Sequence, residues 1–145
     1  MSSASGARPP MTGFHHFSPT VTDVEASVVW YQRVLGLQRV PPRFPHYQNE
    51  ETGYAVVLFD ADSKVAIGLH HNEANRGEPC DETRTGVDHI AISVPSRSDL
   101  DSWAAWLDSQ DVAHSGVTDA EDPTPYSVLV FRDPDNIQLE MYYSD

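Results

Sequence analysis

The chain is poor in cysteine and in basic side chains. Cys80 is its only cysteine, so no disulfide can form within the chain. There are 9 Lys and Arg residues against 22 Asp and Glu residues, which gives a formal net charge of −13. This balance argues against a nucleic-acid or anionic-membrane partner, because binding phosphate groups needs clustered cations.

Long hydrophobic runs are absent as well. No apolar stretch approaches the length of a transmembrane helix or a signal peptide. There is also no glycine-rich phosphate-binding loop and no nucleophile motif. We therefore expect a cytoplasmic protein.

What is present fits one folded domain. A chain of 145 residues, 39% of them hydrophobic, is long enough to bury a core. Residues 1–12 are rich in Ser, Ala and Pro and have no periodic pattern, so we expect a disordered tail there. We expect a single domain over residues 13–145.

The domain contains an internal duplication. Gly13–Val21 reads GFHHFSPTV and Gly86–Val94 reads GVDHIAISV, and a shift of 73 residues lays His16 on His89. Both segments are predicted strands. In the second one the apolar residues share one face and His89 lies on the other.

A predicted helix follows each of these strands. The first has a capping box at Thr22–Glu25 and apolar residues at helical spacing until Gly36, a residue type common at helix ends. The second can be capped by Ser96 or Ser98. Its buried stripe is expected to consist of Leu100, Trp103 and Leu107.

Each half then supplies three more predicted strands, so that each half has the pattern βαβββ. The polar segment 72–85 is the expected linker between a first module, residues 13–71, and a second module, residues 86–143. The further strands cover roughly residues 37–40, 54–60 and 64–70 in the first module and 112–117, 126–132 and 137–143 in the second.

The last strand carries a carboxylate at its middle. In Phe131–Tyr143, FRDPDNIQLEMYY, apolar residues alternate with Gln138, Glu140 and Tyr142. Glu140 is therefore expected on the polar face of the strand. The turn Asp133–Asn136 fixes where the strand begins, because Pro presets φ while Asp and Asn tolerate turn geometry.

His16, His89 and Glu140 together indicate a metal site. Two imidazoles and one carboxylate, each on the polar side of an apolar strand, can hold a divalent metal ion and leave coordination positions open for substrate oxygens. The alternative is that all three are merely exposed or hydrogen-bonded, which is the commoner fate of a single histidine on a strand. A histidine at the same point of both copies favours the metal site.

These features resemble the vicinal oxygen chelate superfamily, which includes glyoxalase, fosfomycin-resistance enzymes, methylmalonyl-CoA epimerase, extradiol dioxygenases and bleomycin-binding proteins. The resemblance rests on the paired modules, the first-strand histidines, a capped helix ending in VLGL and a closing DPDNIQLE strand, and it covers Gly13–Tyr143. It implies an α+β fold in which two paired βαβββ modules form a cup-shaped mixed β-sheet with the helices outside.

The resemblance also implies a ligand set. The family's metal positions match His16, His89 and Glu140, and the cofactor would be a divalent Fe, Mn, Ni, Co or Zn ion. The partner would be a small-molecule substrate. In this family the cup closes either within one chain or across a homodimer.

The fourth metal position departs from the family's pattern. A shift of 72 residues between the corresponding strands places Gly68 opposite Glu140, where glyoxalases and epimerases usually have Glu or Gln. The same shift places His70 opposite Tyr142. Because His70 has the parity of Gly68 along its strand, we expect it at the metal cavity, as a fourth ligand or as a group that transfers protons.

Three functions fit this pattern. The first is a glyoxalase-like lyase, isomerase or epimerase, in which a metal polarises a carbonyl or stabilises an enolate of a substrate bound through vicinal oxygens. The second is an Fe(II)-dependent extradiol-type dioxygenase, because non-haem iron oxygenases also use two histidines and one carboxylate. The third is a metal-free drug-binding resistance protein, which ranks last because such relatives generally lack the ligands present here.

Both enzymatic readings use the same candidate residues. His70 and Glu140 are the expected catalytic residues. The substrate pocket is expected to include Gln138, Tyr142, His114 and Tyr126.

Overall fold

The computed structural model describes residues 6–49 and 51–145. Of the tail expected over residues 1–12, residues 1–5 lie outside the described part, and residues 6–12 contain no helix or strand. No helix in the described ranges is long and apolar enough to cross a membrane. The elements, in chain order, are α1 (Val24–Leu35), β1 (Gln38–Pro45), the short 3-10 helix η1 (His46–Gln48), β2 (Gly53–Phe59), β3 (Ala66–Asn72), β4 (His89–Ser93), α2 (Arg97–Ser109), β5 (His114–Ala120), β6 (Tyr126–Arg132) and β7 (Gln138–Tyr143).

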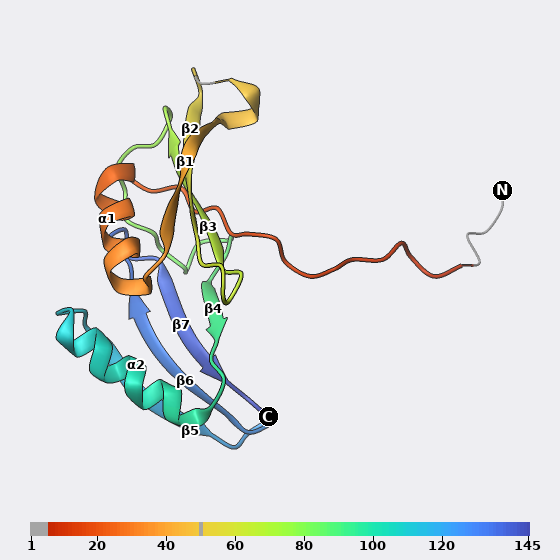
Figure 1. Cartoon of the computed structure of the whole chain (residues 1–145), viewed down its shortest axis with the longest axis vertical. Helices are drawn as coiled ribbons and strands as arrows, with labels where there is room; N and C mark the ends of the chain where they lie inside the picture. Colours follow the sequence, from red (N-terminus) through yellow and green to blue (C-terminus); the bar gives the residue numbers. More distant parts are fainter. Residues whose placement is uncertain (1–5, 50) are drawn as a thin grey trace.

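The described strands form two sheets, one in each half of the chain (Figure 1). Their orders are β1-β2-β3 and β4-β7-β6-β5. Strand β4 runs parallel to β7, whereas the other neighbouring strands are antiparallel. The two halves thus follow the expected βαβββ plan of an α+β fold.

The first predicted strand is irregular. Its segment runs parallel to β3 and pairs with it at two isolated bridges, formed by Phe17 and by Thr20. Pro19 explains the interruption, because it has no N–H to donate in the middle of this pairing. Backbone hydrogen bonds on both sides of Pro19 still hold the segment beside β3, in the place that β4 takes beside β7 in the second half.

Helix α1 begins one residue later than the predicted capping box. Asp23 is the N-cap, and its carboxylate accepts a hydrogen bond from the Ala26 N–H at 3.1 Å. Thr22 lies outside the helix and bonds to the other half of the chain. Gly36 ends the helix in the left-handed conformation, with φ of 68°, as predicted.

Strand β1 runs past its predicted end to Pro45, in spite of Pro41 and Pro42. The pairing of β1 with β2 is irregular between Arg39 and Arg43. The two prolines therefore lie in a break of the ladder on an edge strand, which is where a sheet tolerates residues without an N–H.

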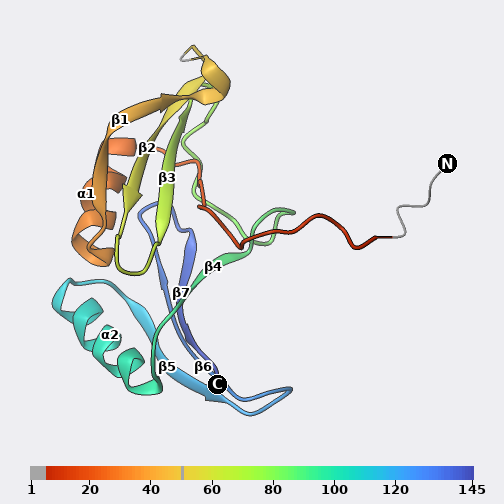
Figure 2. The same ribbon diagram turned by 45° about the vertical axis from the view of Figure 1, so that its right-hand side comes forward.

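Both helices lie on the same side of the molecule, each against its own sheet (Figures 1 and 2). Alternate residues of each strand face the helix, and these make up the buried core. The other face of each sheet has no helix over it. The core is formed mainly by Val28, Tyr31 and Val34 of α1, Leu100 and Leu107 of α2, Val56, Leu58, Ile67 and Leu69 of the first sheet, and Leu129, Phe131, Leu139 and Met141 of the second.

The turn before β7 joins the two halves. Asp133 and Asp135 are buried; the Tyr31 hydroxyl donates to Asp133 at 2.7 Å, and the Thr22 hydroxyl donates to Asp135 at 2.6 Å. Burial raises the pKa of Asp133, and burial together with the neighbouring Asp133 raises that of Tyr31. The predicted turn therefore also anchors helix α1 to the second half.

Candidate functional site

The helix-free faces carry most of the predicted site residues. We call the helix-free side of the β1–β3 sheet, with the segment beside β3, the first open face; it includes His16, Ser18, Gly68 and His70. The helix-free side of the β4–β7–β6–β5 sheet is the second open face. It includes His89, Gln138, Glu140, Tyr142 and Tyr126.

His89 and Glu140 lie next to each other on the second open face. The parallel register of β4 and β7 sets His89 opposite Gln138 and Ala91 opposite Glu140. The His89 Nε2 atom is 3.6 Å from a carboxylate oxygen of Glu140. Glu140 is only 9% exposed, whereas His89 is exposed.

Asp88 orients the His89 ring. The His89 Nδ1 atom is 2.7 Å from the Asp88 carboxylate. Because a carboxylate only accepts hydrogen bonds, Nδ1 is the donor in this contact, which fixes the ring with Nε2 toward Glu140. The ring of a metal-binding histidine is commonly oriented by such a hydrogen bond from its other nitrogen. Sequence reasoning missed Asp88, although its place directly before His89 was a usable signal.

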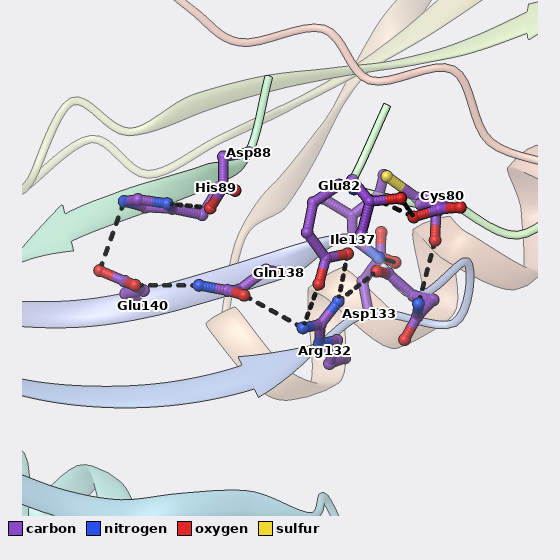
Figure 3. A network of polar contacts seen from close by, with 12 residues as sticks. Cys80, Glu82, Asp88, His89, Arg132, Asp133, Ile137, Gln138 and Glu140 are labelled. Carbon is purple, nitrogen blue, oxygen red and sulfur yellow. Dashed lines mark hydrogen bonds and ion pairs between the residues drawn. The ribbon is translucent and has the colours of Figure 1, made fainter. Parts of the chain in front are cut away.

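Glu140 lacks the cationic partner that a nearly buried carboxylate usually has. Among the described residues, no Lys or Arg forms an ion pair with it. Its neighbours are His89 and the Gln138 side-chain amide, which donates to Glu140 at 3.0 Å (Figure 3). Within the described residues, no Lys or Arg thus meets the charge of Glu140, and the His89 Nε2 atom lies beside it. This donor set suits a divalent cation.

His16 and His70 line a cavity of about 350 Å³ on the first open face. Ser18 and Gly68 line it too, and the rest of the wall comes largely from apolar side chains such as Phe44 on β1. His70 and Gly68 lie on the same face of β3, as their parity predicted.

Two further histidines flank this pair. The Nδ1 atoms of His15 and His16 are 2.8 Å apart, and the ring centres of His46 and His70 are 5.7 Å apart. Burial, followed by the proximity of His46 and then of His16, lowers the pKa of His70 below its ordinary value. Near pH 7 the ring is therefore neutral and can bind a metal or accept a proton. No pattern in the sequence predicted that His46 lies beside His70.

Gly68 occupies the position that corresponds to Glu140 in the other half. A Cβ atom at Gly68 would lie 2.8 Å from the Ser18 hydroxyl oxygen, which is closer than real Cβ contacts. Ser18 thus fills the space that a side chain would need. Neither of these residues supplies a carboxylate to the cavity.

The four predicted ligands form two groups in one chain. His16 and His70 belong to the first open face and are called the first half-site; His89 and Glu140 belong to the second open face and are called the second half-site. Within residues 6–49 and 51–145, no three His, Cys, Asp or Glu side chains are close enough to hold one metal ion. A single chain therefore presents two separate half-sites.

Three of the predicted pocket residues lie on the second open face. Gln138 contacts Glu140 directly. The rings of Tyr126 and Tyr142 stack at 5.5 Å between centres and are nearly parallel, at 9°. Together they form a flat aromatic surface near the second half-site.

His114 does not lie with them. It pairs with the core residue Phe131 across β5 and β6, which puts it on the helix-covered side of the sheet. Its Nε2 atom is 2.7 Å from the Asp108 carboxylate of α2. The prediction that His114 lines the cavity is not supported, because a register shift in β5 between His114 and Val117 changes which face it takes.

Comparison with known proteins agrees with this fold. The family model described as Glyoxalase/Bleomycin resistance protein/Dioxygenase superfamily matches residues 13–141. The putative ring-cleaving dioxygenase MhqA of Bacillus subtilis (strain 168) is 26% identical over 129 residues, which cover 89% of this chain. The present chain spans 39% of the length of that relative.

Solved structures are similar over nearly the whole chain. The glyoxylase/bleomycin resistance protein/dioxygenase domain from Frankia sp. EAN1pec is 28% identical with a TM-score of 0.79, and the match covers 94% of this chain and 100% of that chain. The glyoxalase family protein from Enterococcus faecalis is 18% identical with a TM-score of 0.70, and the match covers 91% of this chain and 98% of that chain. The latter similarity is one of fold alone.

Proposed function

We propose that this chain, which belongs to the Glyoxalase/Bleomycin resistance protein/Dioxygenase superfamily, is a divalent-metal-dependent enzyme acting on a small substrate that binds the metal through vicinal oxygens. The proposed ligands are His16, His89 and Glu140, with His70 beside them. A metal held by two imidazoles and one carboxylate supplies open coordination positions for substrate oxygens and, if it is iron, the redox chemistry of non-haem oxygenases.

The observation that carries this proposal is the environment of Glu140. A carboxylate that is 9% exposed and has no Lys or Arg partner among the described residues is costly unless a cation compensates it. His89, whose Nε2 atom lies 3.6 Å from Glu140, offers the second donor for such a cation.

We propose further that two copies of the chain complete the site. Among the described residues, the candidate ligands do not form one group of three in a single chain, and no α-helix covers either open face (Figure 2). The first half-site of one copy would then face the second half-site of its partner. Each copy of such a dimer would supply His16 and His70 to one site and His89 and Glu140 to the other.

Mixing two variants tests this arrangement. His16→Ala and Glu140→Ala are each expected to bind little metal alone. After denaturation and refolding together, a mixed dimer has one site that carries both changes and one site that carries neither, so metal binding returns in part. If the ligands of one site come from one chain, mixing restores nothing. Two His16→Ala preparations refolded together serve as the control.

Among the reactions of the superfamily, oxidative cleavage of an aromatic diol ring fits the cavity best. Gly68 and Ser18 leave the fourth ligand position without a carboxylate, so the expected set is two histidines and one carboxylate. The largely apolar wall that includes Phe44 suits a flat ring. His70 can take the proton from a substrate hydroxyl at its free ring nitrogen. The name of the relative MhqA, a putative ring-cleaving dioxygenase, supports the same reaction.

Oxygen consumption tests the reaction. Protein loaded with Fe(II) without oxygen is expected to take up dioxygen when a panel of substituted catechols is added, and Glu140→Ala is expected to take up none. The variant His114→Ala, changed on the helix-covered face, should match the wild type. Metal-loaded wild type that consumes no oxygen with any diol would overturn the ring-cleavage proposal.

A lyase or isomerase reaction is the second candidate, and His70 favours it. A neutral imidazole beside the substrate could move a proton between two carbon atoms. His70→Ala separates the roles: loss of metal would make His70 a ligand, whereas retained metal with a large fall in kcat would make it an acid or base. Unchanged metal affinity and turnover would exclude both roles.

A further inference from the structure

We propose that Arg132 and Glu82, neither of which touches a candidate metal ligand, are positioning residues that fix the Glu140 carboxylate through Gln138. This inference rests on the proposed function, because it takes Glu140 as a ligand. Figure 3 shows the chain of contacts, which runs from Glu82 in the linker to Arg132, then to Gln138, Glu140 and His89.

The orientation of the Gln138 amide follows from its two neighbours. Arg132 Nη2 donates to Gln138 Oε1 at 3.1 Å, and Gln138 Nε2 donates to Glu140 Oε1 at 3.0 Å. A guanidinium group has only donors and a carboxylate has only acceptors. Turning the amide over would set donor against donor at Arg132 and acceptor against acceptor at Glu140. Arg132 therefore forces Gln138 to donate to Glu140.

Arg132 is itself held by Glu82. Its Nη1 and Nη2 atoms donate to the two carboxylate oxygens of Glu82 at 2.9 and 2.8 Å, a bidentate pair. Nη1 also donates to the Asn136 carbonyl oxygen at 3.2 Å. These contacts fix the plane of the guanidinium group, so that Nη2 is aimed at Gln138.

The linker that carries Glu82 is anchored nearby. The Cys80 N–H donates to the Asp135 carbonyl oxygen at 2.7 Å, and the Asn136 side-chain amide donates to the Cys80 carbonyl oxygen at 3.0 Å. Glu82 thus lies two residues after Cys80, which is hydrogen-bonded to the turn before β7. The segment that joins the two halves therefore contributes to the position of a ligand on β7.

As a result, the two carboxylate oxygens of Glu140 have different partners. Oε1 accepts from Gln138, while Oε2 is the oxygen 3.6 Å from His89 Nε2. The carboxylate is therefore presented with Oε2 toward the place between Glu140 and His89 where a metal would bind. Without the amide contact, the carboxylate could rotate about its terminal bond and this preorganisation would be lost.

Mn(II) affinity measured by calorimetry tests the proposal. Gln138→Leu and Arg132→Met are expected to weaken Mn(II) binding by roughly 10-fold to 100-fold, the range for partners of ligating residues. Arg132→Lys should fall between them and the wild type, because one ammonium group cannot bond Glu82 in bidentate fashion and Gln138 as well. Glu82→Gln should have the smallest effect. Glu78→Gln, which removes a linker carboxylate that contacts Arg84 and not Arg132, is the matched control and should match the wild type.

A second measurement needs no metal. In the metal-free wild type, the side-chain amide protons of Gln138 should give NMR signals shifted from those of an exposed glutamine, and the proton bonded to Glu140 should exchange slowly with water. Arg132→Met should move these signals toward those of an exposed glutamine without changing the fold. This readout distinguishes orientation of the amide from a general loss of stability.

The outcomes are separable. Unchanged Mn(II) affinity in Gln138→Leu and Arg132→Met would overturn the positioning role. If the wild type binds no Mn(II), the proposed metal function fails, and the NMR signals alone then decide whether Arg132 orients Gln138. Unchanged Gln138 signals in Arg132→Met would overturn that as well.

Discussion

The two open faces follow the same βαβββ plan and carry different chemistry. At the residue before each first-strand histidine, the second half has Asp88 and the first half has His15. Both side chains touch the following ring, at 2.7 and 2.8 Å. On the later strand, the second half has Glu140 where the first half has Gly68.

The two open faces therefore contribute unequally to the charge of the proposed site. The second open face supplies the anionic ligand and a histidine whose ring orientation is fixed by a carboxylate. The first open face supplies imidazoles and a largely apolar wall, with no carboxylate at the position of Glu140. A site that joins both would bind a cation mainly through one face and shape the substrate pocket mainly with the other.

The largest expected effect is the removal of a ligand from either face. Glu140→Ala and His16→Ala should each lower Mn(II) affinity by more than about 100-fold, since even partners of ligands are worth 10-fold to 100-fold. Isothermal titration calorimetry and metal analysis of purified protein measure this. His71→Ala removes a β3 histidine that bonds to Glu73 and should leave affinity unchanged. Equal metal content in all variants would contradict the assignment.

Giving the first face a carboxylate should reduce the difference between the faces. Gly68→Glu combined with Ser18→Gly, which removes the hydroxyl 2.8 Å from a Cβ at position 68, adds an oxygen ligand beside His16 and His70. We expect metal binding to tighten by roughly tenfold, as an added anionic ligand favours a divalent cation. Ser18→Gly alone is the control. Affinity equal to that of the control would mean that position 68 does not face the metal.

The residues that precede the two histidines should differ in importance. Asp88→Ala frees the His89 ring and is expected to weaken metal binding by about tenfold, the lower end of the range for such partners. His15→Ala should have a smaller effect, because a neutral imidazole does not dictate which nitrogen of His16 carries the hydrogen. Side-by-side titrations of both variants compare the two faces directly. The reverse order would show that His15 is the stronger orienting group.

The contribution of the Glu82–Arg132 ion pair to stability should depend on pH in a defined direction. Hydrogen bonds from Arg132 lower the pKa of Glu82 to about 2, from an ordinary value of 4.5. A carboxyl whose pKa is depressed by folding stabilises the fold above its unfolded pKa and loses this contribution as the pH falls. The wild type should therefore have a higher melting temperature than Glu82→Gln at pH 7, by a small margin because the pair is still partly open to solvent. The margin should shrink below about pH 4.5 and vanish near pH 2.

The smallest effect is expected at His114, on the covered side of the second sheet. His114→Ala removes the contact with Asp108 and should leave metal affinity and turnover at wild-type values. The cost in stability should be about 1–3 kcal/mol, because the mostly buried His114 side chain also accepts a hydrogen bond from the Gly116 N–H. Metal titration and thermal melting check both points. A loss of metal would place His114 at the site after all.

The main features of the fold were predictable because they depend on local chemistry. The duplicated βαβββ pattern follows from apolar periodicity, and Gly36 and the Asp133–Asn136 turn end and begin elements through their own backbone preferences. The predicted N-cap was wrong by one residue. Asp23 caps the helix, because the Thr22 hydroxyl donates to Asp135, which lies far along the chain. His114 failed because a register shift within β5 changes its face, and an alternating pattern cannot show such a shift.

The alternation along each strand is enough to assign His16, His70, His89 and Glu140 to a face, because neighbouring residues of a strand point to opposite sides. Which of these side chains meet depends on the three-dimensional fold. That depends on how the halves are joined, through contacts such as Tyr31 with Asp133, between residues far apart in the chain. The pairing of β4 with β7 brings His89 to Glu140, and the pairing of the first segment with β3 brings His16 to His70, so each pair stays on its own sheet.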